Sequence, residues 1–324
     1  MAKKKSKKKS KFQKLLITLL ILGAVFAVIL ILTPDEKVSQ ITGSNAIAGL
    51  EIPGTDFASQ VVSHTGYTLC YSEKDEQPYW VAYVLTREEI NGTVARDDNF
   101  RSDPSITTGS ATLSDYKLSG YDRGHLIPAA DLCYSTEAMN DSFYLSNMSP
   151  QAPDFNRGIW ADLEATVRNF AQNDGLIYVV TGPILSEGPY KTIGNSKVSV
   201  PDYYYKAILD YSEPETKAIG FILPNKGSDG DLQSFAVSID TVEERTGIDF
   251  FPLLDDKDEN ALEASYTTSL WDFGQFYRSS ADASADSNSN ESVASDARTI
   301  VLNILYEVFG DLKRQIVSSL KSLI

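Results

Sequence analysis

Histidine and cysteine are scarce in this chain of 324 residues. The two cysteines, Cys70 and Cys133, allow at most one disulfide bond, and the sequence leaves open whether they pair or stay as buried free thiols. With only two histidines present, there is reason to expect one of them, His125, to be placed for chemistry. The other, His64, has no acidic or cysteine neighbour in the segment SHTGY and is interpreted as a structural or surface residue.

Positive charge is also scarce outside the N-terminus. Residues 1–14 carry eight lysines and no acid, so removing them takes the formal net charge from −15 to about −23 for the rest of the chain. Such an acidic body disfavours ordinary nucleic-acid binding, because affinity for phosphate backbones comes largely from lysine and arginine. Any site for a polyanion must therefore be locally basic or must use a cation.

One long apolar run follows the lysines. Residues 15–32 contain no charged side chain and would span roughly 27 Å as a helix, which predicts a membrane segment. The lysines before it predict a cytoplasmic N-terminus and an extracellular main domain, that is, a single-pass protein of the cell membrane. A cleaved signal peptide is the competing interpretation, but Thr33 to Glu36 is a poor cleavage site.

Composition divides the chain into six expected parts. They are a basic cytoplasmic tail (1–14), a transmembrane signal anchor (15–33), a linker (34–58), a globular domain (59–277), a disordered Ser/Ala/Asp linker (278–298) and an amphipathic helix (299–324). The last helix has apolar residues every three or four positions, so it could lie on a membrane surface, self-associate or pack on the main domain.

Within the globular part, apolar runs separated by polar turns predict an α+β domain with a largely antiparallel sheet flanked by helices. Tyr67–Tyr71 and Pro78–Thr86 flank a polar turn and predict a hairpin. Further strands are expected at 143–145, 176–184, 203–211 and 218–225, and helices at 135–140, 157–173 and 232–247.

The segment YDRGHLIPAAD, Tyr121–Asp131, places His125 between an arginine–glycine pair and a short apolar run. Hydrolysis of a phosphodiester needs an attacking water, stabilised phosphoryl oxygens and a protonated leaving oxygen. Because imidazole is near neutral at physiological pH and can accept a proton from water, His125 is the candidate base.

A second polar cluster follows about thirty residues later. Asn156 and Glu164 offer an amide oxygen and a carboxylate, which are ligands that Mg²⁺ accepts. With Asn156 at the start of a helix, the eight-residue spacing would place both on similar faces. Each also has a plain alternative, Asn156 as a helix N-cap and Glu164 as a surface partner of Arg168.

Arginines lie in or near both clusters, and guanidinium groups suit phosphate oxygens. They are Arg96, Arg101, Arg123, Arg157 and Arg168. They could supply the local positive potential that the acidic body lacks, or they could form surface ion pairs.

Taken in order, six segments resemble the DNA/RNA non-specific endonuclease family, which includes endonuclease G and secreted bacterial nucleases. The segments are RDDNFRSDP, YDRGHLIPAAD, FYLSNMSPQAPDFNRGIWADLE, VVTGPI, VSVPDYYYKAIL and IGFILPN. The resemblance extends from about Tyr67 to Tyr277. It implies a ββα-metal (His-Me finger) fold, in which a hairpin and a helix frame one Mg²⁺, with Mn²⁺ as a possible substitute.

The resemblance also implies residue roles. His125 would be the general base, Asn156 the direct metal ligand, and Glu164 would hold metal-bound waters. Arg96 and Arg123 would contact the phosphate, with Asp122 supporting the site's geometry. Arg168 matches a recurring arginine, and Arg157, where relatives often have a neutral amide, would add a nucleic-acid contact.

The expected function is therefore Mg²⁺-assisted cleavage of DNA and RNA with little sequence preference, leaving 5′-phosphate ends. One alternative is a surface receptor that captures nucleic acid, for example for uptake, without cutting it. Another is an adhesion or assembly protein in which the terminal helix, residues 299–324, is the working part.

Overall fold

The fold was analysed in a computed structural model, which describes residues 46–54 and 59–274. The predicted basic tail, transmembrane anchor, disordered linker and terminal amphipathic helix lie outside these residues. Among the helices of the described ranges, none is both long enough and apolar enough to cross a membrane.

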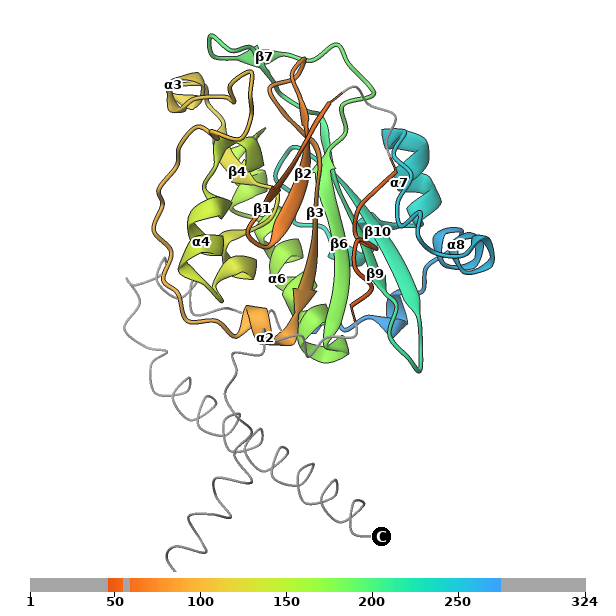
Figure 1. Cartoon of the computed structure of the whole chain (residues 1–324). Coiled ribbons are helices and arrows are strands. Elements are labelled where there is room, and N and C mark those ends of the chain that lie inside the picture. The colour runs from red at the N-terminus through yellow and green to blue at the C-terminus, as the bar shows by residue number, and fades with distance from the viewer. Residues whose placement is uncertain (1–45, 55–58, 275–324) are drawn as a thin grey trace, which may run out of the picture. The chain divides into compact units, whose positions relative to one another are not determined.

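A seven-stranded sheet forms the centre of the domain, and every neighbouring pair of its strands is antiparallel (Figure 1). Its order is β1 (Gln60–His64), β2 (Tyr67–Ser72), β3 (Gln77–Thr86), β6 (Leu176–Pro183), β9 (Tyr203–Asp210), β10 (Lys217–Pro224) and β11 (Ala236–Val237). The predicted α+β class and antiparallel sheet are confirmed. So is the first hairpin, in which Leu69 of β2 pairs with Val81 of β3.

Helices cover both faces of the sheet, which explains why its strands read as continuous apolar runs. Figure 1 shows α4 (Thr136–Ser142) and α6 (Ile159–Asp174) on one face, and α7 (Ile239–Thr246) and α8 (Asp256–Glu263) on the other. Side chains of β3 alternate between two cores: Val81 and Tyr83 pack on the α6 side, and Trp80 and Ala82 on the α7 side.

Smaller elements surround the sheet. They are the helices α2 (Arg87–Ile90), α3 (Leu113–Tyr116) and α5 (Pro153–Asn156), the ribbon of β4 (Asp122–His125) with β5 (Met148–Gln151), and the ribbon of β7 (Thr192–Ile193) with β8 (Val198–Ser199). The DRGH sequence thus forms a short strand outside the main sheet.

The helix expected at 157–173 is confirmed as α6, which begins two residues later at Ile159, after Gly158, whose φ of −111° and ψ of −118° are not helical. Asn156, expected at the start of that helix, is instead the last residue of the separate short helix α5. Asn156 and Glu164 are therefore not on one continuous helix, and the argument from their spacing fails. The helix expected at 232–247 begins only at Ile239, where the Ser238 side chain caps α7.

The expected strand at 143–145 is absent from the described structure. Phe143 is the C-cap of α4, and Leu145–Asn147 form a 3₁₀ turn. The chain turns here because the Phe143 and Tyr144 amides donate to the carbonyls of Asn140 and Asp141, which completes the end of α4.

Residues 46–54, assigned from composition to the linker, pack against the sheet. Leu50 is fully buried, and the Ile47 amide donates to the Tyr178 hydroxyl at 2.7 Å. The globular unit therefore starts earlier than the expected boundary at residue 59. Cys70 and Cys133 are both buried and form no disulfide bond in the described structure, which answers the question that the sequence left open.

Candidate active site

His125 is presented by the β4–β5 ribbon. It pairs with Met148, and the preceding Gly124 pairs with Ser149. A Cβ atom on Gly124 would lie 2.1 Å from the Gln151 side chain, so the close approach of the two strands requires glycine here. The ribbon is fixed to α6 by Trp160, whose Nε1 donates to the His125 carbonyl at 3.4 Å.

The His125 side chain is buried, with 8% of its surface exposed. Its ring packs edge-on against Phe143, with centroids 5.1 Å apart. Within the described part of the chain, its buried Nε2 has no hydrogen-bond partner. Burial lowers the pKa of His125 well below its usual value, and the charges of Arg96 and Arg123 lower it further. The imidazole is therefore neutral at physiological pH and can accept a proton.

Two aromatic rings hold arginines around this imidazole. The guanidinium of Arg96 lies 4.9 Å from the centroid of Phe143, the same ring that packs on His125. The guanidinium of Arg123 lies 4.4 Å from the centroid of Phe100, which is 5.7 Å from the His125 ring. Cation–π contacts of this kind place two positive charges beside the candidate base.

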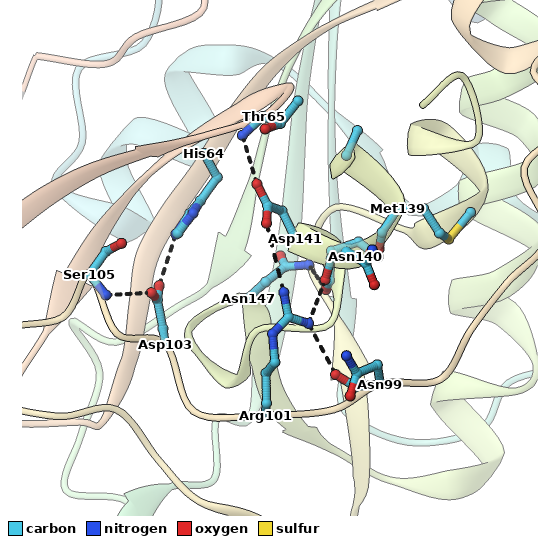
Figure 2. A network of polar contacts seen from close by, with 12 residues as sticks. His64, Thr65, Asn99, Arg101, Asp103, Ser105, Met139, Asn140, Asp141 and Asn147 are labelled. Carbon is cyan, nitrogen blue, oxygen red and sulfur yellow. Dashed lines mark hydrogen bonds and ion pairs between the residues drawn. The ribbon is translucent and has the colours of Figure 1, made fainter. Parts of the chain in front are cut away.

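The loop that carries Arg96 is held in place by Arg101 (Figure 2). Arg101 Nη1 donates to the carbonyls of Asn140 at 2.8 Å and Asn99 at 3.1 Å. Its guanidinium also lies 3.9 Å from the centroid of the Tyr144 ring and 3.8 Å from an Asp141 oxygen. Arg101 is thus committed to contacts that join the loop to α4.

The same region confirms the structural interpretation of His64. Its Nε2 is 2.8 Å from Asp103 Oδ2, and both side chains are buried (Figure 2). Asp103 also accepts from the Ser146 hydroxyl at 2.6 Å and from the Ser105 amide at 2.8 Å. His64 therefore joins β1 to the middle of the loop between α2 and α3, and its partner could not be recognised in the sequence because it lies 39 residues away.

The Asp122 carboxylate binds the side chains of both Asn156 and Arg157. The Asn156 Nδ2 donates to Asp122 Oδ2 at 3.0 Å, and Arg157 donates to both carboxylate oxygens, at 2.8 and 2.7 Å. Because the amide nitrogen is used in this way, the Asn156 Oδ1 is left without a hydrogen-bond partner among the described residues. A partly exposed amide oxygen fixed beside a carboxylate is a suitable ligand for a hard divalent cation.

A buried charge cluster lies beneath the ribbon, and sequence reasoning missed its central residue, Lys206 of β9. Its Nζ donates to the Leu126 carbonyl at 3.4 Å and lies 4.6 Å from the centroid of the Trp160 ring. Burial lowers the pKa of Lys206 to about 8, although the charge of Glu164 acts in the opposite direction. Glu164 is half-buried on α6 and close enough to Lys206 to interact with it electrostatically.

Arg168, expected to contact substrate, points into this cluster. Its Nη1 donates to Asp131 Oδ1 at 3.0 Å, and the two side chains are only 4% and 1% exposed. Asp131 also accepts from the Tyr83 hydroxyl at 3.0 Å. The structure thus gathers Arg96 and Arg123 around His125 and joins Asn156 to Arg157 through Asp122, but it buries Arg168.

Comparison with known proteins identifies the group to which this arrangement is similar. A family model of DNA/RNA non-specific endonucleases matches residues 48–257. The mitochondrial nuclease 1 of Schizosaccharomyces pombe is 37% identical over 218 residues, 61% of this chain and 67% of the relative. Nuclease C1 of Cunninghamella echinulata is 36% identical over 228 residues, 65% and 90% of the two chains. Human mitochondrial endonuclease G is 34% identical over 220 residues, 64% and 73%.

A solved structure agrees with these relatives. The crystal structure of an EndoG/EndoGI complex contains a chain with 31% sequence identity and a TM-score of 0.59, and the match covers 69% of this chain and 94% of the other. The α+β architecture around a large antiparallel sheet is therefore shared with a nuclease of known structure.

The comparisons correct the localisation expected from the sequence. Several relatives are mitochondrial nucleases, and the described residues contain no helix able to cross a membrane. The mitochondrial relatives contradict the expectation of a single-pass cell-membrane protein with an extracellular nuclease domain. The expectation rested on residues 15–33, which lie outside the described ranges, and on the lysines before them.

Proposed function

Because the chain belongs to the DNA/RNA non-specific endonuclease family, we propose that it hydrolyses phosphodiester bonds in both DNA and RNA and leaves 5′-phosphate ends. The observation that carries the proposal is His125, a buried imidazole with a lowered pKa and an unpartnered Nε2 beside two arginines. A neutral nitrogen in a positive environment is suited to accept a proton from water next to a bound phosphate.

In this proposal different side chains activate the water and bind the phosphate. His125 Nε2 takes a proton from the attacking water. Arg96 and Arg123 hold the scissile phosphate and offset the negative charge that grows on its oxygens in the transition state. These contacts go to the phosphate rather than to base edges, so they carry no sequence information. Little sequence preference follows.

We further propose that Asn156 Oδ1 holds one divalent cation, Mg²⁺ or Mn²⁺, with Glu164 acting through bound waters. When bound, the cation would stabilise charge on the phosphoryl oxygens and the leaving 3′ oxygen. Asp122 supports this role by fixing the amide nitrogen of Asn156, which leaves the oxygen available. Arg157 offsets the Asp122 charge and, with a side chain that is 72% exposed, remains within reach of nucleic acid.

Glu164 and Arg168 have different roles in this proposal. Glu164 is half-buried on α6, close enough to the buried Lys206 for their opposite charges to attract each other. Arg168 acts on the site indirectly, because its partner Asp131 follows the apolar run after His125 and is held there by the buried pair. Arg168 is therefore a positioning residue in this proposal.

The proposal is tested by cleavage of plasmid DNA and of RNA by the purified protein, with Mg²⁺ and with chelator. His125→Ala should slow cleavage of both substrates by about 10²–10⁴-fold, the usual contribution of a general base. Asn156→Ala should also abolish metal-dependent cleavage, whereas Asn173→Ala, an exposed asparagine at the end of α6, should behave as wild type. A folded wild-type protein that binds DNA but cuts neither substrate would instead be a nucleic-acid receptor.

A further inference from the structure

A second charged site lies on the opposite face of the sheet from α6, where α7 and α8 pack together. An open pocket of about 270 Å³ is lined by Asp240, Glu243, Asp249, Glu259, Asn260 and Glu263. Five of the six are acidic, and none of them forms an ion pair with a described residue. The pocket therefore concentrates negative charge that no neighbouring lysine or arginine offsets.

Three of these carboxylates converge on one point. One oxygen from each of Asp240, Glu243 and Glu263 lies within 4.8 Å of the other two. Two oxygens that share a calcium ion at about 2.3–2.6 Å can be no more than roughly 5 Å apart, so this spacing fits a common cation. Asp240 and Glu243 are three residues apart on α7 and Glu263 is the last residue of α8, so a shared ion would connect the two helices.

Glu263 supplies an observation that is independent of the clustering. It is 5% exposed, it lines the pocket, and its buried Oε1 has no hydrogen-bond partner among the described residues. A buried carboxylate oxygen without a partner is unfavourable, and a cation in the pocket would satisfy it.

The neighbouring groups are arranged in a way that favours an oxygen-rich cation site. Glu243 Oε1 accepts the Phe250 amide at 2.7 Å, which fixes its carboxylate. The Asn260 Nδ2 donates to the Asp256 carbonyl, so the amide oxygen is the group left for a ligand. The lining holds no histidine or cysteine, which disfavours zinc.

We propose that Asp240, Glu243 and Glu263 bind a calcium ion that ties α7 to α8. Calcium accepts six to eight oxygen ligands in irregular arrangements, whereas Mg²⁺ requires near-ideal octahedral geometry and retains several waters. Carboxylates from two helices, an amide oxygen and water match the first description. The site is separate from Asn156 and does not depend on the nuclease proposal.

The test measures calcium binding and thermal unfolding of the full chain after treatment with chelator. An Asn156→Ala background removes binding at the candidate active site. In this background we expect one calcium ion per chain by calorimetry, and a rise in Tm of about 5–10 °C at a hundredfold excess over Kd. Glu263→Gln should abolish both effects while leaving the Tm in chelator equal to or above that of the parent, because the neutral amide needs no cation to compensate it.

Two further variants keep the test decisive. Asp240→Asn changes an exposed residue that does not endanger folding, and it should weaken calcium binding by about tenfold or more. Glu244→Gln changes an exposed neighbour on α7 that does not line the pocket, and it should bind calcium as the parent does. Absence of calcium binding in the parent, or unchanged binding in both Glu263→Gln and Asp240→Asn, would overturn the proposal.

Discussion

Replacing Arg168 by methionine distinguishes a structural arginine from one that contacts substrate. Methionine fills much of the same volume but removes the charge, so it leaves Asp131 buried with only part of its compensation. Removing one member of a buried ion pair costs about 3–5 kcal/mol. We expect the lower end of that range, because Asp131 keeps the Tyr83 hydroxyl at 3.0 Å and the nearby charge of Lys206.

This loss should be visible in equilibrium unfolding. A cost of about 3 kcal/mol corresponds to a fall in Tm of about 6–12 °C for a domain of this size. Urea unfolding should give a lower midpoint with an unchanged m-value. Changing Asp131→Asn together with Arg168→Met removes both charges, so the double variant should recover most of the lost stability.

Arg157→Met is the matched control, since Arg157 is 72% exposed and pairs with Asp122 at the surface. It should unfold close to the wild-type temperature, and its affinity for DNA should fall with a salt slope reduced by about one. If Arg168→Met is as stable as wild type but shows the reduced salt slope instead, Arg168 contacts substrate and the structural assignment is wrong.

Three other changes test the surroundings of His125. Arg96→Gln removes a charge that lowers the pKa of His125, so the acid limb of the kcat/KM profile should move to higher pH; an unmoved limb would exclude His125 as the titrating base. Because the folded-state pKa of His125 is lowered, its contribution to stability is complete above the unfolded value of about 6.5 and is lost as the pH falls below it; the urea midpoint should drop between pH 7 and 5 in wild type, and less in His125→Leu. Gly124→Ala should cost about 1–3 kcal/mol through its collision with Gln151, and Gln151→Ala should relieve part of that cost; equal stability of Gly124→Ala and wild type would contradict the close packing of the ribbon.

The sheet was predictable because its strands are apolar runs bounded by polar turns. Leu176–Pro183 and Tyr203–Asp210 are buried along almost their whole length, since helices cover both faces, and their length of eight residues favours strands over helices. The candidate site residues His125 and Asn156 were recognised because the motifs around them resemble those of a known nuclease family. Hydrophobic periodicity did not identify them. Asn156 was expected at the start of a long helix, and this was wrong, because it is the last residue of the short helix α5.

What the sequence could not reveal is contact between distant segments. Lys206 stands in a strand where a lysine usually marks an exposed face, and only the fold shows that it reaches the carbonyl of Leu126. Arg168 looked like a surface residue because Asp131 lies 37 positions earlier. Apolar spacing predicted α6, but it could not show that Asn156 belongs to a separate short helix before Gly158.

The two covered faces of the sheet have a consequence for how the protein meets its substrate. Arginines around His125 lie on the α6 side, and the carboxylates of α7 and α8 lie on the other. This separation gives the domain an electric dipole across the sheet. The negative charge of an approaching polyanion therefore turns the arginine side of the domain toward the polyanion and the acidic side away from it.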